Sequence, residues 1–175
     1  AVFALGVTPT FDLNAFSQEE DQNVFVNPLV ESVYEMGSII KPLTLAAGID
    51  SGSITAQSTY YDAGSITIDG ETISNFDGKG RGVVSMQEVL NESLNTGAAH
   101  VVSQMGKESF REYLFAYGFG TETGIDLPNE SAGLVQNLYS PRELEYATAS
   151  FGQGFASTPI ATVRALASIA NGGML

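Results

Sequence analysis

The run from Tyr34 to Thr44 constrains this chain more than any other stretch. Within it a glycine precedes Ser38, and Lys41 follows three residues later in a segment that is typical of a helix start. Residues three apart lie on one helix face, so the Ser38 hydroxyl and the Lys41 amine can meet. A serine hydroxyl is a weak nucleophile until a neighbouring base takes its proton. The spacing therefore indicates nucleophilic catalysis, although Ser-x-x-Lys also occurs by chance in many chains.

The setting of this pair favours the same chemistry. Unpaired N–H groups and the positive dipole end of a helix start stabilise negative charge beside Ser38. The same field, together with burial, would shift Lys41 toward its neutral, basic form. The helical pattern continues from residue 37 to about residue 50 with apolar side chains on every side, which predicts a helix buried in the centre of the domain.

Charge and cysteine content exclude several other functions. The net charge of −13 comes from 7 Lys and Arg against 20 Asp and Glu. Phosphate binding needs a basic surface, so this balance argues against a nucleic-acid partner, and it argues equally against docking on anionic lipid. The absence of cysteine excludes disulfides, thiolate catalysis and cysteine-based metal sites.

The hydrophobic pattern predicts one α+β domain, mostly helical with a small sheet. The apolar run over residues 1–8 predicts a buried strand. Residues 65–68 and 71–74 alternate with period two around Asp69-Gly70, which predicts a hairpin. Further helices are expected from 85 toward 90, over 96–105, over 107–116, from Ser140 with its following proline to about 149, and from Thr158 to a terminator at 172–173. No apolar run reaches the ~20 residues that span a bilayer.

A second motif, Ser93-Leu94-Asn95, lies on a loop between two expected helices. Next to a serine–lysine pair, a second hydroxyl can pass a proton to a leaving amine. An amide such as Asn95 can donate to a substrate carbonyl and accept from a lysine. The same residues also suit an ordinary helix cap, and taken alone this motif favours the cap.

Taken together, the two motifs resemble the active-site set of penicillin-binding proteins and serine β-lactamases. The whole chain, over residues 1–175, is similar to the transpeptidase domain of class B penicillin-binding proteins. The matching segments are Pro9-Thr10-Phe11-Asp12-x-Asn14, Tyr34-Glu35-x-Gly37-Ser38-x-x-Lys41-Pro42, Thr123-Gly124-Ile125-Asp126-Leu127-Pro128, and Gly152-Gln153-Gly154 with Thr158-Pro159. Met36 and Leu13 stand where this family usually has proline. The resemblance implies the α+β penicillin-binding-protein and serine β-lactamase-like fold.

The family's third motif, Lys-Thr-Gly or Lys-Ser-Gly, does not occur in the sequence. The three lysines, Lys41, Lys79 and Lys107, are followed by proline, glycine and glutamate. In the family this motif lies beyond the helix expected to end near residue 172, so we expect residues 1–175 to be an incomplete transpeptidase domain. In the family, the strand that carries this motif supplies an N–H group to the oxyanion hole. Removing one such donor costs ~10²–10³ in rate. We therefore expect these 175 residues alone to be weakly active or inactive.

The resemblance also implies a mechanism, which is peptidoglycan cross-linking through a serine acyl-enzyme. Ser38 attacks the carbonyl between the terminal D-alanines of a stem peptide while Lys41 takes its proton. Ser93 passes a proton toward the leaving D-alanine, and Asn95 holds both the acyl chain and Lys41. The implied substrate-binding residues are Gly37, Ser38, Asn95, Gly152, Gln153 and Gly154.

Partners and compartment follow from the same resemblance. Peptidoglycan stem peptides and β-lactam antibiotics are the expected ligands, with neither a metal nor an organic cofactor. A membrane-anchored parent is expected on the extracytoplasmic face of the bacterial membrane, together with a membrane glycosyltransferase and other cell-wall machinery.

Two alternatives stay open at the level of sequence. A β-lactam-hydrolysing or β-lactam-sensing relative would need a base for the deacylating water, and no Glu-x-x-x-Asn type of loop is identifiable. A non-catalytic cell-wall scaffold would have no need to keep Ser38, Lys41, Ser93 and Asn95 together. His100, the only histidine, is expected to have a structural or surface role. Tyr60-Tyr61 and the phenylalanines at 110, 115 and 119 are expected in the core.

Overall fold

The computed structural model describes residue 2 and residues 4–175. The α-helices are α1 (Lys41–Asp50), α2 (Met86–Asn91), α3 (Asn95–Met105), α4 (Lys107–Ala116), α5 (Glu143–Ala149) and α6 (Pro159–Ala170). The 3₁₀ helices are η1 (Phe16–Gln18), η2 (Gln22–Phe25), η3 (Gly37–Ile40) and η4 (Gln136–Tyr139). The strands are β1 (Thr59–Asp62), β2 (Ser65–Ile68), β3 (Glu71–Ser74) and β4 (Gly82–Ser85).

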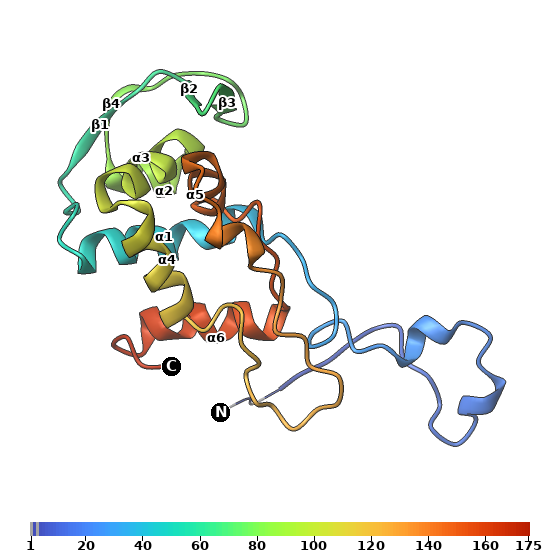
Figure 1. The fold of residues 1–175 in the computed structure, drawn as a ribbon. Helices are drawn as coiled ribbons and strands as arrows, with labels where there is room; N and C mark the ends of the chain where they lie inside the picture. The colour runs from blue at the N-terminus through green and yellow to red at the C-terminus, as the bar shows by residue number, and fades with distance from the viewer. Residues whose placement is uncertain (1, 3) are drawn as a thin grey trace.

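The helices form the body of the molecule, and two small sheets cover the end where α2 and α3 lie (Figure 1). Helix α1 packs against α3, α4 and α6, and its side chains Leu43 and Leu45 belong to the core. Ile39, in η3 just before α1, and Ile49, near the end of α1, are exposed. The prediction of a helix buried in the centre of the domain is therefore confirmed for α1, but the first predicted turn is the 3₁₀ helix η3, and Ile39 and Ile49 are not buried.

The hairpin predicted around Asp69-Gly70 is confirmed. Strands β2 and β3 pair antiparallel with Ile66 opposite Ile73. Asp69 and Gly70 both have positive φ, 52° and 85°, as a two-residue turn that matches the strand twist requires. Ile73 is buried against α3 and α5, so the hairpin lies beside the start of α3.

The second sheet, β1 with β4, was not expected from the sequence. Thr59 pairs with Ser85 and Asp62 with Gly82, and the strands are only four residues long. Burial alternates along β1, so Tyr60 is buried while Tyr61 is 72% exposed. The prediction that both tyrosines belong to the core is therefore wrong for Tyr61. Tyr60 stacks on His100 at 5.2 Å between ring centroids, and this contact gives His100 the structural role expected for it.

Two predicted elements differ from the structure. Residues 1 and 3 of the predicted strand over 1–8 lie outside the described residues, and the described part of that run pairs with no strand of the described chain. Helix α5 begins at Glu143, later than the predicted start at Ser140. Arg142 has extended backbone, and the Leu144 N–H donates to Asp69 Oδ2 at 2.9 Å. The hairpin turn therefore supplies the cap that was expected from Ser140.

The other helices agree with prediction. Helix α2 begins after Ser85, whose hydroxyl accepts from the Glu88 N–H, and α6 begins after Thr158, which caps Ala161. Helix α4 has the predicted bounds, 107–116. Of the three phenylalanines expected in the core, those at 110 and 119 are buried and that at 115 is partly buried.

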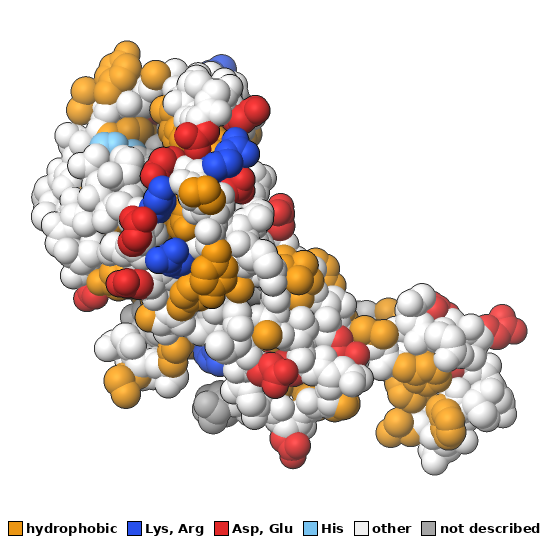
Figure 2. All heavy atoms as spheres, in the orientation of Figure 1, with side chains coloured by type: hydrophobic (Ala, Val, Ile, Leu, Met, Phe, Trp, Pro, Cys, Tyr) orange, Lys and Arg blue, Asp and Glu red, His pale blue; other side chains and the backbone are white. Residues whose placement is uncertain are grey.

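The segment over residues 9–28 projects from the body as an arm (Figure 1). Hydrophobic side chains gather on it (Figure 2), and the ring of Phe11 packs edge-on against that of Phe25 at 4.7 Å. No helix among the described residues is long and apolar enough to cross a membrane.

Candidate active site

Ser38 lies in the 3₁₀ turn η3, which leads directly into α1. Gly37 enters this turn with φ of +60°, a conformation that side chains rarely adopt. Ser38 is exposed, and its backbone N–H has no acceptor among the described residues. The nucleophile candidate therefore stands at a helix start with a free N–H beside it, as an oxyanion requires.

Lys41 is 1% exposed and is the first residue of α1. Its Nζ lies 3.1 Å from Ser38 Oγ, 2.9 Å from Ser93 Oγ and 2.6 Å from the Ser93 carbonyl oxygen. No carboxylate pairs with it within the described part of the chain. Burial lowers the pKa of Lys41 from its ordinary value to about 8, so the amine gives up its proton far more readily than a surface lysine does.

Ser93 lies between α2 and α3 with φ of +53°, which is unusual for a residue other than glycine. Leu94, completely buried, fixes the loop in the core. Ser93 Oγ lies 3.0 Å from Ser38 Oγ. The Ser38 and Ser93 hydroxyls and the Lys41 amine therefore form a closed triangle. When the Lys41 amine is neutral, each of these three groups can donate one hydrogen bond and accept one within the triangle.

Asn95, the first residue of α3, is half-buried. Its Nδ2 donates to the carbonyl oxygen of Ser74, the last residue of β3, at 2.9 Å. Among the described contacts Lys41 Nζ bonds to the Ser93 carbonyl and to the two serine hydroxyls, so the expected contact between Asn95 and Lys41 stays a prediction. A backbone acceptor leaves no signal in a sequence, so the motif alone could not indicate the bond to the Ser93 carbonyl.

Gly152, Gln153 and Gly154 lie beside the segment that precedes Ser38. The Gly37 N–H donates to the Gly152 carbonyl at 3.0 Å, and the Gly154 N–H donates to Glu35 Oε1 at 2.8 Å. The backbone of the two glycines is thus bound to the 35–37 segment, whereas Gln153 is exposed. Their expected role in substrate binding stays a prediction.

The comparisons with known proteins fit this arrangement. The family model described as the penicillin binding protein transpeptidase domain matches residues 1–175. The chain belongs to this family. It is 35% identical over 176 residues to stage V sporulation protein D of Bacillus subtilis. This alignment covers 99% of this chain and 27% of that protein. It is 30% identical over 195 residues to peptidoglycan D,D-transpeptidase MrdA of Acinetobacter baumannii, covering 98% of this chain and 29% of that protein.

Solved structures confirm the transpeptidase fold. The crystal structure of a peptidoglycan glycosyltransferase from Burkholderia ambifaria superposes with a TM-score of 0.78 at 28% identity, over 83% of this chain and 46% of that one. The chain thus spans less than half the length of each of these three proteins.

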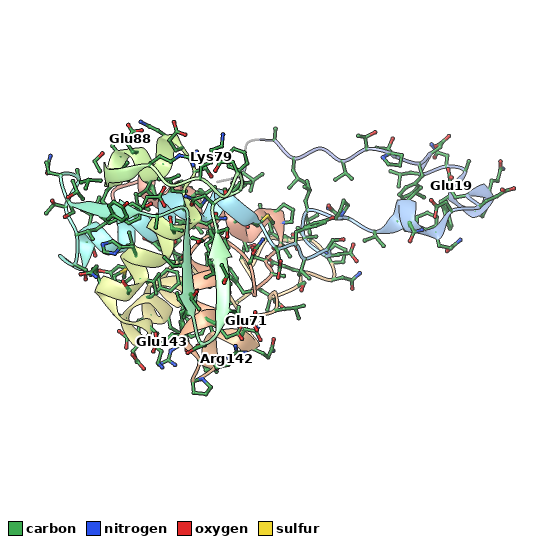
Figure 3. The ribbon with its side chains drawn as sticks, turned by 90° about the horizontal axis from the view of Figure 1, so that it is seen from above. Glu19, Glu71, Lys79, Glu88, Arg142 and Glu143 are labelled. Carbon is green, nitrogen blue, oxygen red and sulfur yellow. The ribbon has the colours of Figure 1, made fainter. Side chains whose placement is uncertain are left out.

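A cavity of about 550 Å³ lies next to the candidate site of this transpeptidase-family chain. It is bounded by the hairpin, by the start of α5 and by Asn95 and Gln153. Glu71 and Arg142, both labelled in Figure 3, line it, so charges of both signs border the cavity. Asn95 therefore lies two residues after Ser93 and also lines this cavity.

Proposed function

We propose that this chain carries the acylating groups of a peptidoglycan D,D-transpeptidase that works through a serine acyl-enzyme. The observation that supports this most is the triangle of Ser38 Oγ, Lys41 Nζ and Ser93 Oγ, with sides of 3.1, 2.9 and 3.0 Å. A serine with a buried, low-pKa amine within hydrogen-bond reach is an activated nucleophile.

The proposed reaction begins at the carbonyl between the terminal D-alanines of a stem peptide. Ser38 Oγ bonds to the carbonyl carbon as its proton moves to neutral Lys41, and the negative charge on the carbonyl oxygen is stabilised by the Ser38 N–H. When the tetrahedral intermediate collapses, the bond to the leaving nitrogen breaks. That nitrogen takes a proton through Ser93 from Lys41, and D-alanine leaves. An amine of a neighbouring strand then displaces Ser38.

β-Lactams would acylate the same serine, because their ring amide presents an equivalent carbonyl. The relatives named above as a D,D-transpeptidase and a glycosyltransferase of peptidoglycan support peptidoglycan as the substrate class. By the same reasoning we propose that the parent protein works at the extracytoplasmic face of the membrane beside a membrane glycosyltransferase. No metal or organic cofactor has a role in this scheme.

A fluorescent penicillin tests the proposal. The natural full-length protein should be labelled stably, and Ser38→Ala should abolish the label. Ser103→Ala is the matched control, because Ser103 is exposed on α3. Its hydroxyl donates to the His100 carbonyl and accepts from the Gln104 amide, both on the same helix. Rapid loss of label would indicate a β-lactam hydrolase instead, and no label in the unmodified protein would indicate a scaffold.

A further inference from the structure

Asp62, the last residue of β1, is 1% exposed and has no cation paired with it among the described residues. The nearby guanidinium of Arg81 pairs with Asp77 and Glu92 instead. A buried carboxylate without a counter-ion is costly unless hydrogen bonds surround it. The arrangement around Asp62 therefore calls for an explanation beyond packing.

Neutral donors surround this carboxylate. The N–H groups of Gly64 and Arg81 each donate at 3.0 Å, Asn75 Nδ2 at 3.0 Å and Thr96 Oγ1 at 2.8 Å. Burial alone would raise the pKa of the Asp62 carboxyl, but these hydrogen bonds outweigh it and lower that pKa. Asp62 is thus an ionised acceptor that binds three separate segments together.

One of these segments is the first turn of α3. Thr96 has a single hydroxyl proton, and the contact with Asp62 is its shortest. The Tyr60 hydroxyl, 3.1 Å from Thr96 Oγ1, must then be the donor to Thr96. Since Thr96 directly follows Asn95, Asp62 fixes the turn on which Asn95 stands.

The second segment is the end of β3. Asn75 Nδ2 is bound to Asp62 and to the carbonyl oxygen of Lys79, while Asn75 Oδ1 accepts from the Thr96 N–H at 3.3 Å. Lys79 lies on the loop between β3 and β4, with its side chain on the outside of the molecule (Figure 3). The residue before Asn75 is Ser74, whose carbonyl oxygen accepts from Asn95. Asp62 thus binds Thr96, which follows Asn95, and Asn75, which follows Ser74, the hydrogen-bond partner of Asn95.

We propose that Asp62 is a positioning residue for the candidate active site. Through Thr96 and Asn75 it holds the Ser93–Asn95 loop in the place where the Ser93 carbonyl meets Lys41. Among the described contacts Asp62 makes no hydrogen bond to Ser38, Lys41 or Ser93, so it acts only through its two partners. This inference rests on the proposed function.

Thr96→Val in the full-length protein tests the inference, with Thr96→Ser as the rescue. Valine keeps the shape of threonine and removes its donor, whereas serine keeps the hydroxyl. Asp62→Asn is a poorer choice, because its amide hydrogens would face the surrounding donors and destabilise the fold itself. Thr162→Val is the matched control. Thr162 is also a buried threonine, it lies on α6, and its hydroxyl is hydrogen-bonded to Ser157 and Thr158.

We expect Thr96→Val to lower the second-order rate of penicillin acylation at least tenfold and Thr96→Ser to stay within about threefold of the unmodified protein. The pH at which acylation reaches half its maximum should also move upward in Thr96→Val, because a loosened loop lets water reach Lys41. Thr162→Val should leave both quantities unchanged at a similar loss of thermal stability. Asn75→Ala, which removes the second link, should behave like Thr96→Val.

Acylation at the unmodified rate and pH midpoint in folded Thr96→Val or Asn75→Ala would overturn the inference. So would equal losses in Thr96→Val and Thr162→Val, because they would show a general effect of stability. Failure of the proposed function is distinguishable, since the unmodified protein would then carry no label that depends on Ser38.

Discussion

Gly152 accepts a hydrogen bond from the N–H of Gly37 at 3.0 Å, and a Cβ on Gly152 would overlap the Gly37 carbonyl oxygen. Gly152 also has φ of +78°, so both its conformation and its neighbour require glycine. This contact joins the turn after α5 to the residue before Ser38. The position of the candidate nucleophile therefore depends on a residue more than a hundred positions away in the sequence.

Gly152→Ala should displace the turn that carries Ser38. We expect a loss of about 2–4 kcal/mol of stability, from the left-handed conformation and the overlap together, and at least a tenfold slower acylation by penicillin. Gly52→Ala is the control, because Gly52 has φ of +74° and open space around its Cβ position. Equal melting temperatures and equal labelling rates in the two variants would contradict this prediction.

The lowered pKa of Lys41 predicts how the rate of acylation depends on pH. Its pKa of about 8 leaves roughly a tenth of the amine neutral at pH 7, compared with well under a thousandth for an unperturbed lysine. The rate of acylation by penicillin should rise about tenfold per pH unit below pH 8 and level off above it. A rate that is flat between pH 6 and 8 would contradict the assignment of Lys41 as the base.

The lowered pKa of Lys41 also makes the stability of the fold depend on pH, because the folded and unfolded chains bind different numbers of protons. Between about pH 8 and the ordinary lysine value, the unfolded chain keeps a proton that the folded chain has lost, so stability contributed by Lys41 rises with pH. Below pH 8 both states are charged, and the burial penalty is present in full. Lys41→Met should therefore raise the melting temperature more at pH 7 than at pH 9.5, as thermal unfolding at the two pH values would measure.

Much of this site was predictable because it depends on short-range geometry. Ser38 and Lys41 meet because they lie three residues apart on one turn, and the Asp69-Gly70 hairpin follows from the conformations that its turn demands. The link between Gly37 and Gly152 was not predictable in this way, because it joins backbone atoms of distant segments. The same holds for the Asn95 contact with the Ser74 carbonyl. Strands β1 and β4 were not expected because they pair across residues 63–81 and not through a tight turn, so no turn signal marks them in the sequence.

A substitution at Ser93 should affect the rate of acylation and the melting temperature in different ways. Its φ of +53° is a strained conformation for serine, and glycine would adopt it without cost. Ser93→Gly should therefore keep or raise the melting temperature while it slows acylation by ~10²–10⁴, because the hydroxyl that bonds to Ser38 and Lys41 is lost. Asn129→Gly is the matched control, since Asn129 is exposed with φ of +58° and should gain stability with unchanged labelling. A loss of stability in Ser93→Gly that parallels its loss of rate would show that the residue serves packing alone.

Residues 1–175 by themselves provide the last prediction. In the proposed mechanism they supply the Ser38 N–H as one oxyanion donor, and they contain no Lys-Thr-Gly, the motif from which the resemblance implies the second. Since one donor is worth ~10²–10³ in rate, the isolated stretch should be acylated at least a hundredfold more slowly than a longer chain that also carries a Lys-Thr-Gly strand. Fluorescent penicillin labelling of both at equal concentration measures the ratio, and circular dichroism shows whether the shorter chain is folded. Equal labelling rates would mean that the groups needed for acylation are all present among these 175 residues, and that the oxyanion is stabilised by the Ser38 turn without the third motif.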